Sequence, residues 1–195
     1  MTAATASGRS RPTRPLIMRL TGQTLCAIAL VAMTPSEIRW SFAAGQDVAF
    51  ATTPPEVIEA MLDLADVGRD DVVYDLGCGD GRIVVAAAKR GARGVGVESD
   101  PALVERARTR AEHEGGSGRT RFEVGNLFEA DLSDATVAML YLQPEPNLRL
   151  RPRLRAELPP GARVVSHSYD MGDWPPDEMR RVAGRRIYLW RIAGP

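Results

Sequence analysis

The chain has little of several residue types, and each shortage excludes a class of protein. Only two cysteines occur in 195 residues, Cys26 and Cys78, so neither a disulfide framework nor a metal-ligating cysteine spacing is expected. Basic and acidic residues balance at 25 each, which argues against a strongly basic nucleic-acid-binding protein. Lys89 is the single lysine, and we attribute this bias towards arginine to genomic base composition.

The chain also lacks an apolar run long enough to cross a bilayer, which takes roughly 20 residues. The uncharged run at residues 25–33 instead suits the hydrophobic region of a secretory signal or a short membrane-associated leader. Residues 1–17 have a disordered composition, and Met18 is an alternative start. We expect a leader over residues 1–50 and a single domain over residues 51–195.

A glycine-rich segment carries most of the information. Residues 73–82 read Val-Tyr-Asp-Leu-Gly-Cys-Gly-Asp-Gly-Arg, between an extended apolar stretch and a helix-like run at residues 83–89. A strand, a tight glycine turn and a helix start form the geometry by which an α/β sheet binds a nucleotide-like ligand. A dinucleotide site needs G-x-G-x-x-G, but here the third glycine comes one residue early and Arg82 occupies the expected glycine position. The spacing therefore disfavours a dinucleotide oxidoreductase.

Hydrophobic periodicity predicts alternating helices and strands around this turn. Thr53 is the predicted cap of the first helix, and Pro152 is predicted near the first turn of its helix. The helices are expected at residues 54–65, 83–89, 100–111 and 150–158, and the strands at residues 71–75, 94–98, 121–124, 136–142, 162–166, 179–182 and 185–192. This alternation predicts a doubly wound α/β sheet with a terminal antiparallel hairpin.

The spacing Asp75-x-Gly77-x-Gly79-x-Gly81 resembles motif I of the class I S-adenosylmethionine (SAM) methyltransferases. The resemblance implies a Rossmann-like sheet and SAM as cofactor. It also implies cofactor contacts from Cys78 and the glycines of the turn, and it places Asp75 near the ammonium of the methionine part.

Three residues beyond the turn complete the cofactor site that the resemblance implies. Glu98 ends the second predicted strand, 17 residues after Gly81, where a carboxylate meets ribose hydroxyls. Asn126 occupies a position where the family usually has an aspartate facing the adenine amino group, and its side-chain oxygen can still accept that hydrogen bond. Leu127 is expected either to pack on adenine or to belong to the core.

Later segments resemble a smaller group, which includes the ATP synthase c-subunit lysine methyltransferase and its bacterial relatives. The matching segments are residues 130–137, 140–144, 150–154, 160–167 and 171–177, and the resemblance covers roughly residues 52–178. It implies N-methylation of a protein lysine, on a protein partner that can be a membrane protein. Gln143-Pro144 stands where amino-methylating enzymes of DNA carry Asn-Pro-Pro-Tyr, so DNA is not an expected partner.

Tyr141, Gln143 and His167 follow the fourth and fifth predicted strands, where the methyl acceptor is expected. A lysine must lose its proton before it attacks the methyl group, and an apolar aromatic pocket lowers its pKa. His167 is a candidate base, although a structural histidine is the alternative. Two other functions stay open: a small-molecule or RNA methyltransferase, and a non-catalytic SAM-binding module.

Because SAM is made in the cytosol, we expect a cytoplasmic domain. Residues 25–33 are then an uncleaved membrane-associated leader, and export by a signal peptide is the alternative. The expected site contains no metal.

Overall fold

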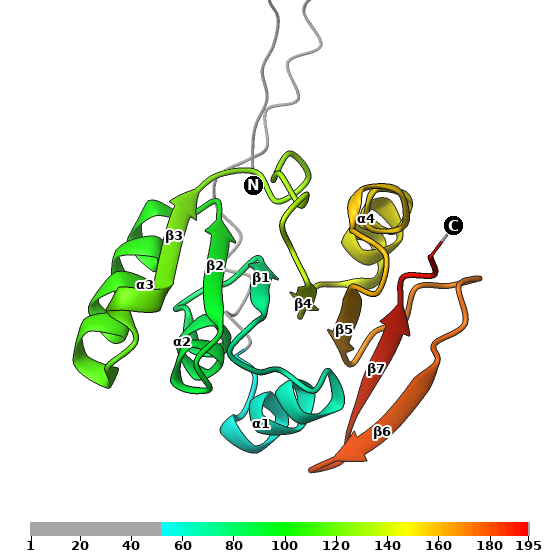
Figure 1. Cartoon of the computed structure of the whole chain (residues 1–195), viewed down its shortest axis with the longest axis horizontal. Coiled ribbons are helices and arrows are strands. Elements are labelled where there is room, and N and C mark those ends of the chain that lie inside the picture. The colour runs from blue at the N-terminus through cyan, green and yellow to red at the C-terminus, as the bar shows by residue number, and fades with distance from the viewer. Residues whose placement is uncertain (1–51, 195) are drawn as a thin grey trace, which may run out of the picture. The chain divides into compact units, whose positions relative to one another are not determined.

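The computed structural model describes residues 52–194 (Figure 1). The expected leader, with its apolar run at residues 25–33, lies outside the described residues. Within residues 52–194, no helix has the length and apolar character needed to span a bilayer.

Seven strands form one sheet in the order β3-β2-β1-β4-β5-β7-β6. Strands β1 to β5 run parallel, whereas β7 is antiparallel to both β5 and β6. The strand bounds are Val72–Leu76 (β1), Arg93–Glu98 (β2), Thr120–Val124 (β3), Val137–Leu140 (β4), Arg163–His167 (β5), Glu178–Val182 (β6) and Arg185–Arg191 (β7). The predicted doubly wound sheet with a terminal antiparallel hairpin is confirmed.

The strand order reverses between β1 and β4, which leaves a crevice at the carboxyl ends of these two strands. In a doubly wound sheet this is the place where a ligand binds. Both the glycine turn after β1 and Tyr141 after β4 belong to this edge.

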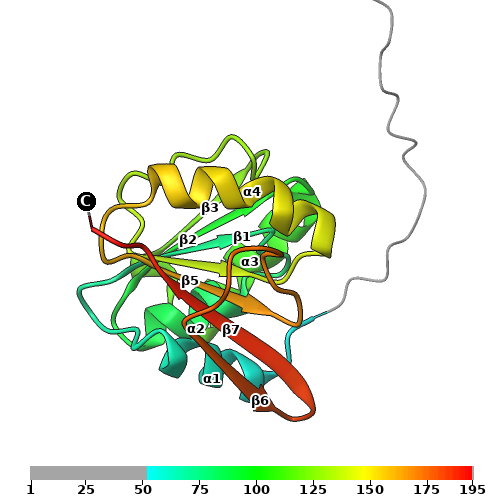
Figure 2. The same cartoon turned by 90° about the vertical axis from the view of Figure 1, so that its right-hand side faces the viewer.

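Helices cover the two faces of the sheet unequally (Figure 2). The helices are α1 (Pro55–Leu64), α2 (Arg82–Lys89), α3 (Pro101–Glu114) and α4 (Pro144–Glu157). Helices α1 and α2 lie on one face and α4 lies on the other. Helix α3 packs with α2. Leu150 and Leu154 of α4 pack with Tyr188 and Trp190, whereas Ile187 belongs to the core formed with α1 and α2.

The prediction for the fourth helix was wrong at its beginning. Helix α4 starts at Pro144, six residues before Leu150, so that Pro152 lies inside the helix. Asn147 is fully buried on the same side as Leu150 and Leu154. A polar residue at a core position interrupts the apolar periodicity, and this hid the first turns of the helix.

The predicted cap of the first helix was also wrong. Pro54 is the N-cap residue of α1, and no side chain caps the helix. The hydroxyl of Thr53 instead lies 3.2 Å from Nδ1 of His167, at the end of β5. A contact between residues so distant in sequence has no local signature, so helix-start rules alone assign Thr53 to the cap.

Candidate functional site

The turn between β1 and α2 has the geometry that its glycines predict. Gly77, Gly79 and Gly81 have φ angles of 84°, 53° and 74°, all in the left-handed region. A Cβ atom on Gly81 would lie 2.6 Å from Cβ of Ala107 and 2.7 Å from Cε1 of Phe122. Only glycine fits there, because both the backbone angle and the packing of α3 and β3 exclude a side chain.

Glu98 lies against this turn, as its position after β2 predicts. One carboxylate oxygen accepts a hydrogen bond of 3.1 Å from the backbone N–H of Gly79. The other accepts bonds of 2.7 Å and 3.1 Å from the N–H groups of Ser99 and Asp100. These contacts hold the carboxylate at the end of the parallel strands, where it can accept hydrogen bonds from a ribose.

Asp75 is only 2% exposed and faces a small pocket of about 40 Å³. Burial, with the nearby charges of Glu98 and Asp80, raises the pKa of its carboxyl to about 8. Thr52, Thr53, Gly77, Arg82 and Tyr141 are among the other residues that line this pocket. A cation that enters the pocket would favour the ionised carboxylate, so the site suits an ammonium group.

Asn126 forms a compact turn after β3. Its side-chain oxygen accepts a 3.0 Å hydrogen bond from the N–H of Phe128, and its amide group donates to Glu129 over 2.9 Å. Leu127 extends towards the glycine turn, since its Cδ2 lies 3.7 Å from the position of a Cβ on Gly77. The structure thus brings Leu127 next to the turn, and one lone pair of the Asn126 oxygen is already used.

Two of the three acceptor-side candidates come together. The rings of Tyr141 and His167 stack with centroids 3.9 Å apart. His167 is fully buried, and its Nε2 atom has no hydrogen-bond partner within the described residues. Burial and the positive charge of Arg185 lower the pKa of His167 to about 4. The imidazole is neutral at pH 7, but so low a pKa makes it a weak base, and the ring has no access to solvent; both argue against a role as base.

Gln143 does not join this pair. It is exposed, and it forms the N-cap of α4, where its backbone carbonyl accepts a 3.3 Å hydrogen bond from Asn147. Its side chain is absent from the lining of the pocket at Asp75.

The sequence profile described as the ANTKMT methyltransferase domain matches residues 75–178. The chain belongs to this family. It is 44% identical over 151 residues to a protein-lysine N-methyltransferase of Saccharolobus islandicus, covering 74% of this chain and 94% of that relative. It is 33% identical over 167 residues to the human ATP synthase c-subunit lysine N-methyltransferase, covering 84% and 69% of the two chains.

A solved structure extends the comparison to the ligand. The RNA methyltransferase of Salinibacter ruber, crystallised with S-adenosyl-L-homocysteine, is 51% identical to this chain with a TM-score of 0.73. The match covers 74% of this chain and 95% of that one. S-adenosylhomocysteine is SAM without its methyl group. SAM is therefore the methyl donor of this methyltransferase.

Cys78 sits inside the glycine turn of this methyltransferase without a reactive environment. Its sulfur lies 2.6 Å from where a Cβ on Gly96 would be, so it fills a tight space beside β2. Burial and the neighbouring carboxylates raise the pKa of the thiol, which keeps it protonated. Cys78 thus acts here as a small residue that fills the space between the turn and β2.

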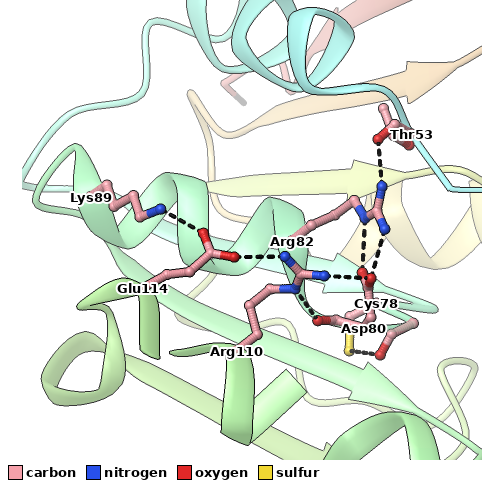
Figure 3. Close-up of polar contacts among 8 residues, drawn as sticks. Thr53, Cys78, Asp80, Arg82, Lys89, Arg110 and Glu114 are labelled. Carbon is pink, nitrogen blue, oxygen red and sulfur yellow. Dashed lines mark hydrogen bonds and ion pairs between the residues drawn. The ribbon is translucent and has the colours of Figure 1, made fainter. Parts of the chain in front are cut away.

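An ion-pair cluster behind the turn was not predicted (Figure 3). The carboxylate of Asp80 pairs with Arg82 at 2.6 Å and with Arg110 at 2.8 Å. Arg82 also donates a 3.2 Å hydrogen bond to the carbonyl of Thr53. Arg110 continues to Glu114 at 2.6 Å. The cluster thus connects α3, the glycine turn and the segment before α1.

The sequence contained only part of the signal for this cluster. Arg82 stands out because it replaces the glycine of the dinucleotide pattern, but its partners are set by the fold. Arg110 lies 30 residues from Asp80, and Thr53 lies 29 residues from Arg82. Within residues 52–194, no group of three or more metal-ligating side chains occurs.

Proposed function

We propose that this methyltransferase transfers the methyl group of SAM to the amine of a lysine in a protein substrate. The observation that carries the proposal is the stacked Tyr141–His167 pair, which lies at the same sheet edge as the buried carboxylate of Asp75. The two lysine methyltransferases to which the chain is similar support the same acceptor.

Each donor-side residue is proposed to contact a different part of SAM. Glu98 is placed to accept hydrogen bonds from the ribose hydroxyls, and Asp75 to pair with the ammonium of the methionine part. Leu127 and the turn at Asn126 border the adenine end. The glycine turn provides close backbone approach without a Cβ in the way. SAM supplies the electrophilic methyl group, bound to a positively charged sulfur.

The acceptor side suits a neutral amine. The positively charged sulfur of SAM disfavours a second cation beside it, so a lysine that enters next to Tyr141 loses its proton more easily. His167 supports the Tyr141 ring from behind and stays uncharged at pH 7. Its buried position assigns it to positioning Tyr141, and the proton of the lysine leaves to water. Transfer then depends on in-line placement of the amine beside the sulfonium.

RNA is the second candidate acceptor, because the Salinibacter ruber protein is described as an RNA methyltransferase. Two observations favour protein. The formal net charge is zero, and no aromatic side chain is among the exposed large hydrophobic residues in the described part of the chain. RNA-binding surfaces usually combine basic charge with exposed aromatic rings that stack on bases.

The deciding experiment uses the full chain, radiolabelled SAM and a cell lysate treated with either ribonuclease or protease. Labelled methyl-lysine in ribonuclease-resistant, protease-sensitive material supports the proposal. Label in ribonuclease-sensitive material would assign RNA as the acceptor instead. The variant Lys89→Arg serves as the enzyme in a matched reaction, because it contains no lysine and cannot contribute methyl-lysine itself.

A cytoplasmic location with membrane association through residues 25–33 is part of this proposal. Those residues lie outside the described range, so the support is the apolar character of the run alone. Fractionation of cells that express the full chain or a variant without residues 25–33 tests it. Equal recovery of both in the soluble fraction would exclude the association.

A further inference from the structure

Four arginines gather at the end of the terminal hairpin, which we name the arginine tip: Arg180, Arg181, Arg185 and Arg186. All four are exposed. Within residues 52–194, Glu178 is the single carboxylate that pairs with any of them, and it contacts Arg180 at 2.7 Å. The tip is thus a local concentration of positive charge on a chain with no net charge.

Two of these arginines face each other across the hairpin. Arg181 of β6 is directly opposite Arg186 of β7, so their side chains lie on the same face of the sheet. Like charges in such a cross-strand pair destabilise a sheet. The structure gives neither side chain an acidic partner within the described residues. An anion bound between them would remove this repulsion.

Protection of the sheet edge does not explain the tip. Charged residues on an edge strand prevent pairing with other chains, which accounts for Arg180 and Arg181 on β6. Arg186 lies on β7 between Arg181 of β6 and Ser168, whose N–H donates to the Arg186 carbonyl, so its backbone is bonded on both sides. The charge of Arg186 needs another reason.

The tip adjoins the acceptor side of the site. His167 is opposite Ile187, and the N–H of Ser168 donates a 2.7 Å hydrogen bond to the carbonyl of Arg186. Figure 2 shows the β6–β7 turn on the side towards which the β5 arrow points. The charge of Arg185 is close enough to lower the pKa of His167. The arginine tip therefore lies beside the end of β5, next to the Tyr141–His167 pair.

The tip is also held in a defined shape. Ala183 and Gly184 connect the strands, and both have positive φ angles, 48° and 76°. This two-residue turn matches the twist of the strands and keeps the hairpin tight. The tight turn fixes the backbone positions of the arginines, which favours binding of a particular partner over non-specific electrostatic attraction.

From these observations we infer that the arginine tip docks an acidic segment of the substrate protein, next to the lysine that is methylated. The inference rests on the proposed lysine acceptor and adds which sequences around the lysine are preferred. Aspartate or glutamate beside the lysine pairs with Arg181 and Arg186, whose side chains share one face of the hairpin, and basic residues there are repelled. Arginine is suited to this role because its planar guanidinium binds a carboxylate through two parallel hydrogen bonds.

The chemistry of the surface favours a protein over a lipid membrane. Met179 is the single exposed large apolar side chain of the hairpin in the described chain, and its neighbours Tyr188 and Trp190 are buried. A peripheral membrane site usually adds several apolar or aromatic side chains that enter the interface. A protein segment with isolated carboxylates, by contrast, can bind through the positive charges of the arginine tip alone.

The test compares two synthetic peptides that differ only beside their single lysine, one with aspartates and one with asparagines. We expect the wild-type chain to methylate the aspartate peptide with a kcat/KM about threefold to tenfold higher at low salt. In the Arg181→Gln/Arg186→Gln variant, which removes both arginines of the cross-strand pair, the ratio should fall to about one. The control variant Arg106→Gln/Arg121→Gln removes the same charge from α3 and β3, and it should keep the wild-type ratio.

A binding measurement separates this inference from the proposed function. Fluorescence anisotropy of the labelled aspartate peptide reports docking whether or not methyl transfer occurs. If the labelled peptide binds the tip variant more weakly than the control variant, the inference is supported. Absence of methylation of both peptides would count against the lysine acceptor but not against this docking.

An equal ratio and equal binding in wild type and tip variant would overturn the inference. So would tip-dependent binding to anionic phosphatidylglycerol vesicles or to RNA without any preference between the peptides. Unchanged SAM affinity and melting temperature of both variants show that the chain remains folded.

Discussion

Two groups of arginines in this methyltransferase differ in what surrounds them. Behind the glycine turn, Arg82 and Arg110 share the carboxylate of Asp80, which is only 12% exposed. At the terminal hairpin, Arg181 and Arg186 face each other with no acidic partner in the described chain. The paired arginines hold the glycine turn through Asp80, whereas the guanidinium groups of Arg181 and Arg186 have no acidic partner in the described chain and can bind one on another molecule.

The pairing also explains the ionisation of Asp80. Burial by itself would raise the pKa of this carboxyl, but Arg82 and Arg110 hold it below its usual value. Asp75, a few residues away, has no such partner and its pKa rises to about 8. The glycine turn therefore has one carboxylate that two arginines neutralise, Asp80, and beside it one buried carboxyl without such a partner, Asp75, which we propose pairs with a cation.

The largest effect is expected from breaking the paired group. Asp80→Asn leaves two arginines without their carboxylate, and we expect the free energy of unfolding to fall by about 2–3 kcal/mol. The control Glu123→Gln breaks an exposed pair with Arg121 and should cost less than about 0.5 kcal/mol. Urea denaturation measures both. Equal losses would contradict the distinction between buried and exposed pairs.

Asp75 gives a prediction for pH. Its carboxyl holds a proton more tightly in the folded chain, so the stability it contributes is lost as pH rises from about 4 to 8. His167, with a pKa of about 4, has the opposite effect up to about pH 6.5, the ordinary value for histidine.

The two effects oppose each other below pH 6.5, so a fall in stability should appear between pH 6.5 and 8. Its slope should reach at most about 1.4 kcal/mol per pH unit. Asp75→Asn should abolish this fall, as denaturant titrations at several pH values would show. A wild-type curve that is flat or rising in this window would show that the carboxyl is ionised in the folded chain.

Thr53 connects the paired arginines with the end of β5. Its carbonyl accepts a hydrogen bond from Arg82, and its hydroxyl contacts His167. Thr53→Val keeps the shape and removes the hydroxyl, at a cost of about 1 kcal/mol in stability. Thr53→Ser should restore most of it. Imidazole nitrogen chemical shifts of His167 should change in the valine variant and return in the serine variant. No change in either variant would exclude the contact.

The smallest expected effect is an increase in the stability of the folded chain. Arg186→Gln relieves the repulsion with Arg181, so we expect the chain to become more stable by about 0.3 kcal/mol. Arg185→Gln is the comparison, because Arg185 is opposite Val182 and faces no like charge. Melting temperatures at low and high salt distinguish them. A loss of stability in Arg186→Gln would show that the residue has a structural partner.

Much of the fold and the donor side could be predicted, because their signals are local. The positive φ angles of the turn follow from the glycine spacing, and the terminal hairpin follows from two short runs around Gly184. The position of Glu98 beside the turn could be predicted because it is a carboxylate at the end of the neighbouring strand, whereas its contact with a ribose stays a prediction.

The rest depends on contacts between distant residues. The start of α4 was hidden by the buried Asn147, whose amide reaches Ser166 over 3.2 Å. The link between Thr53 and His167 spans 114 residues, and no pattern in either segment indicates it. The repulsion between Arg181 and Arg186 exists only once the hairpin register is known.

Calorimetry of SAM binding tests the central claim, that the glycine turn and Glu98 form the site for the methyl donor. We expect the wild-type chain to bind SAM, and Glu98→Gln, which keeps the shape but removes the charge, to bind it at least about tenfold more weakly. Absence of binding by the wild type, or equal affinity in the two proteins, would contradict it.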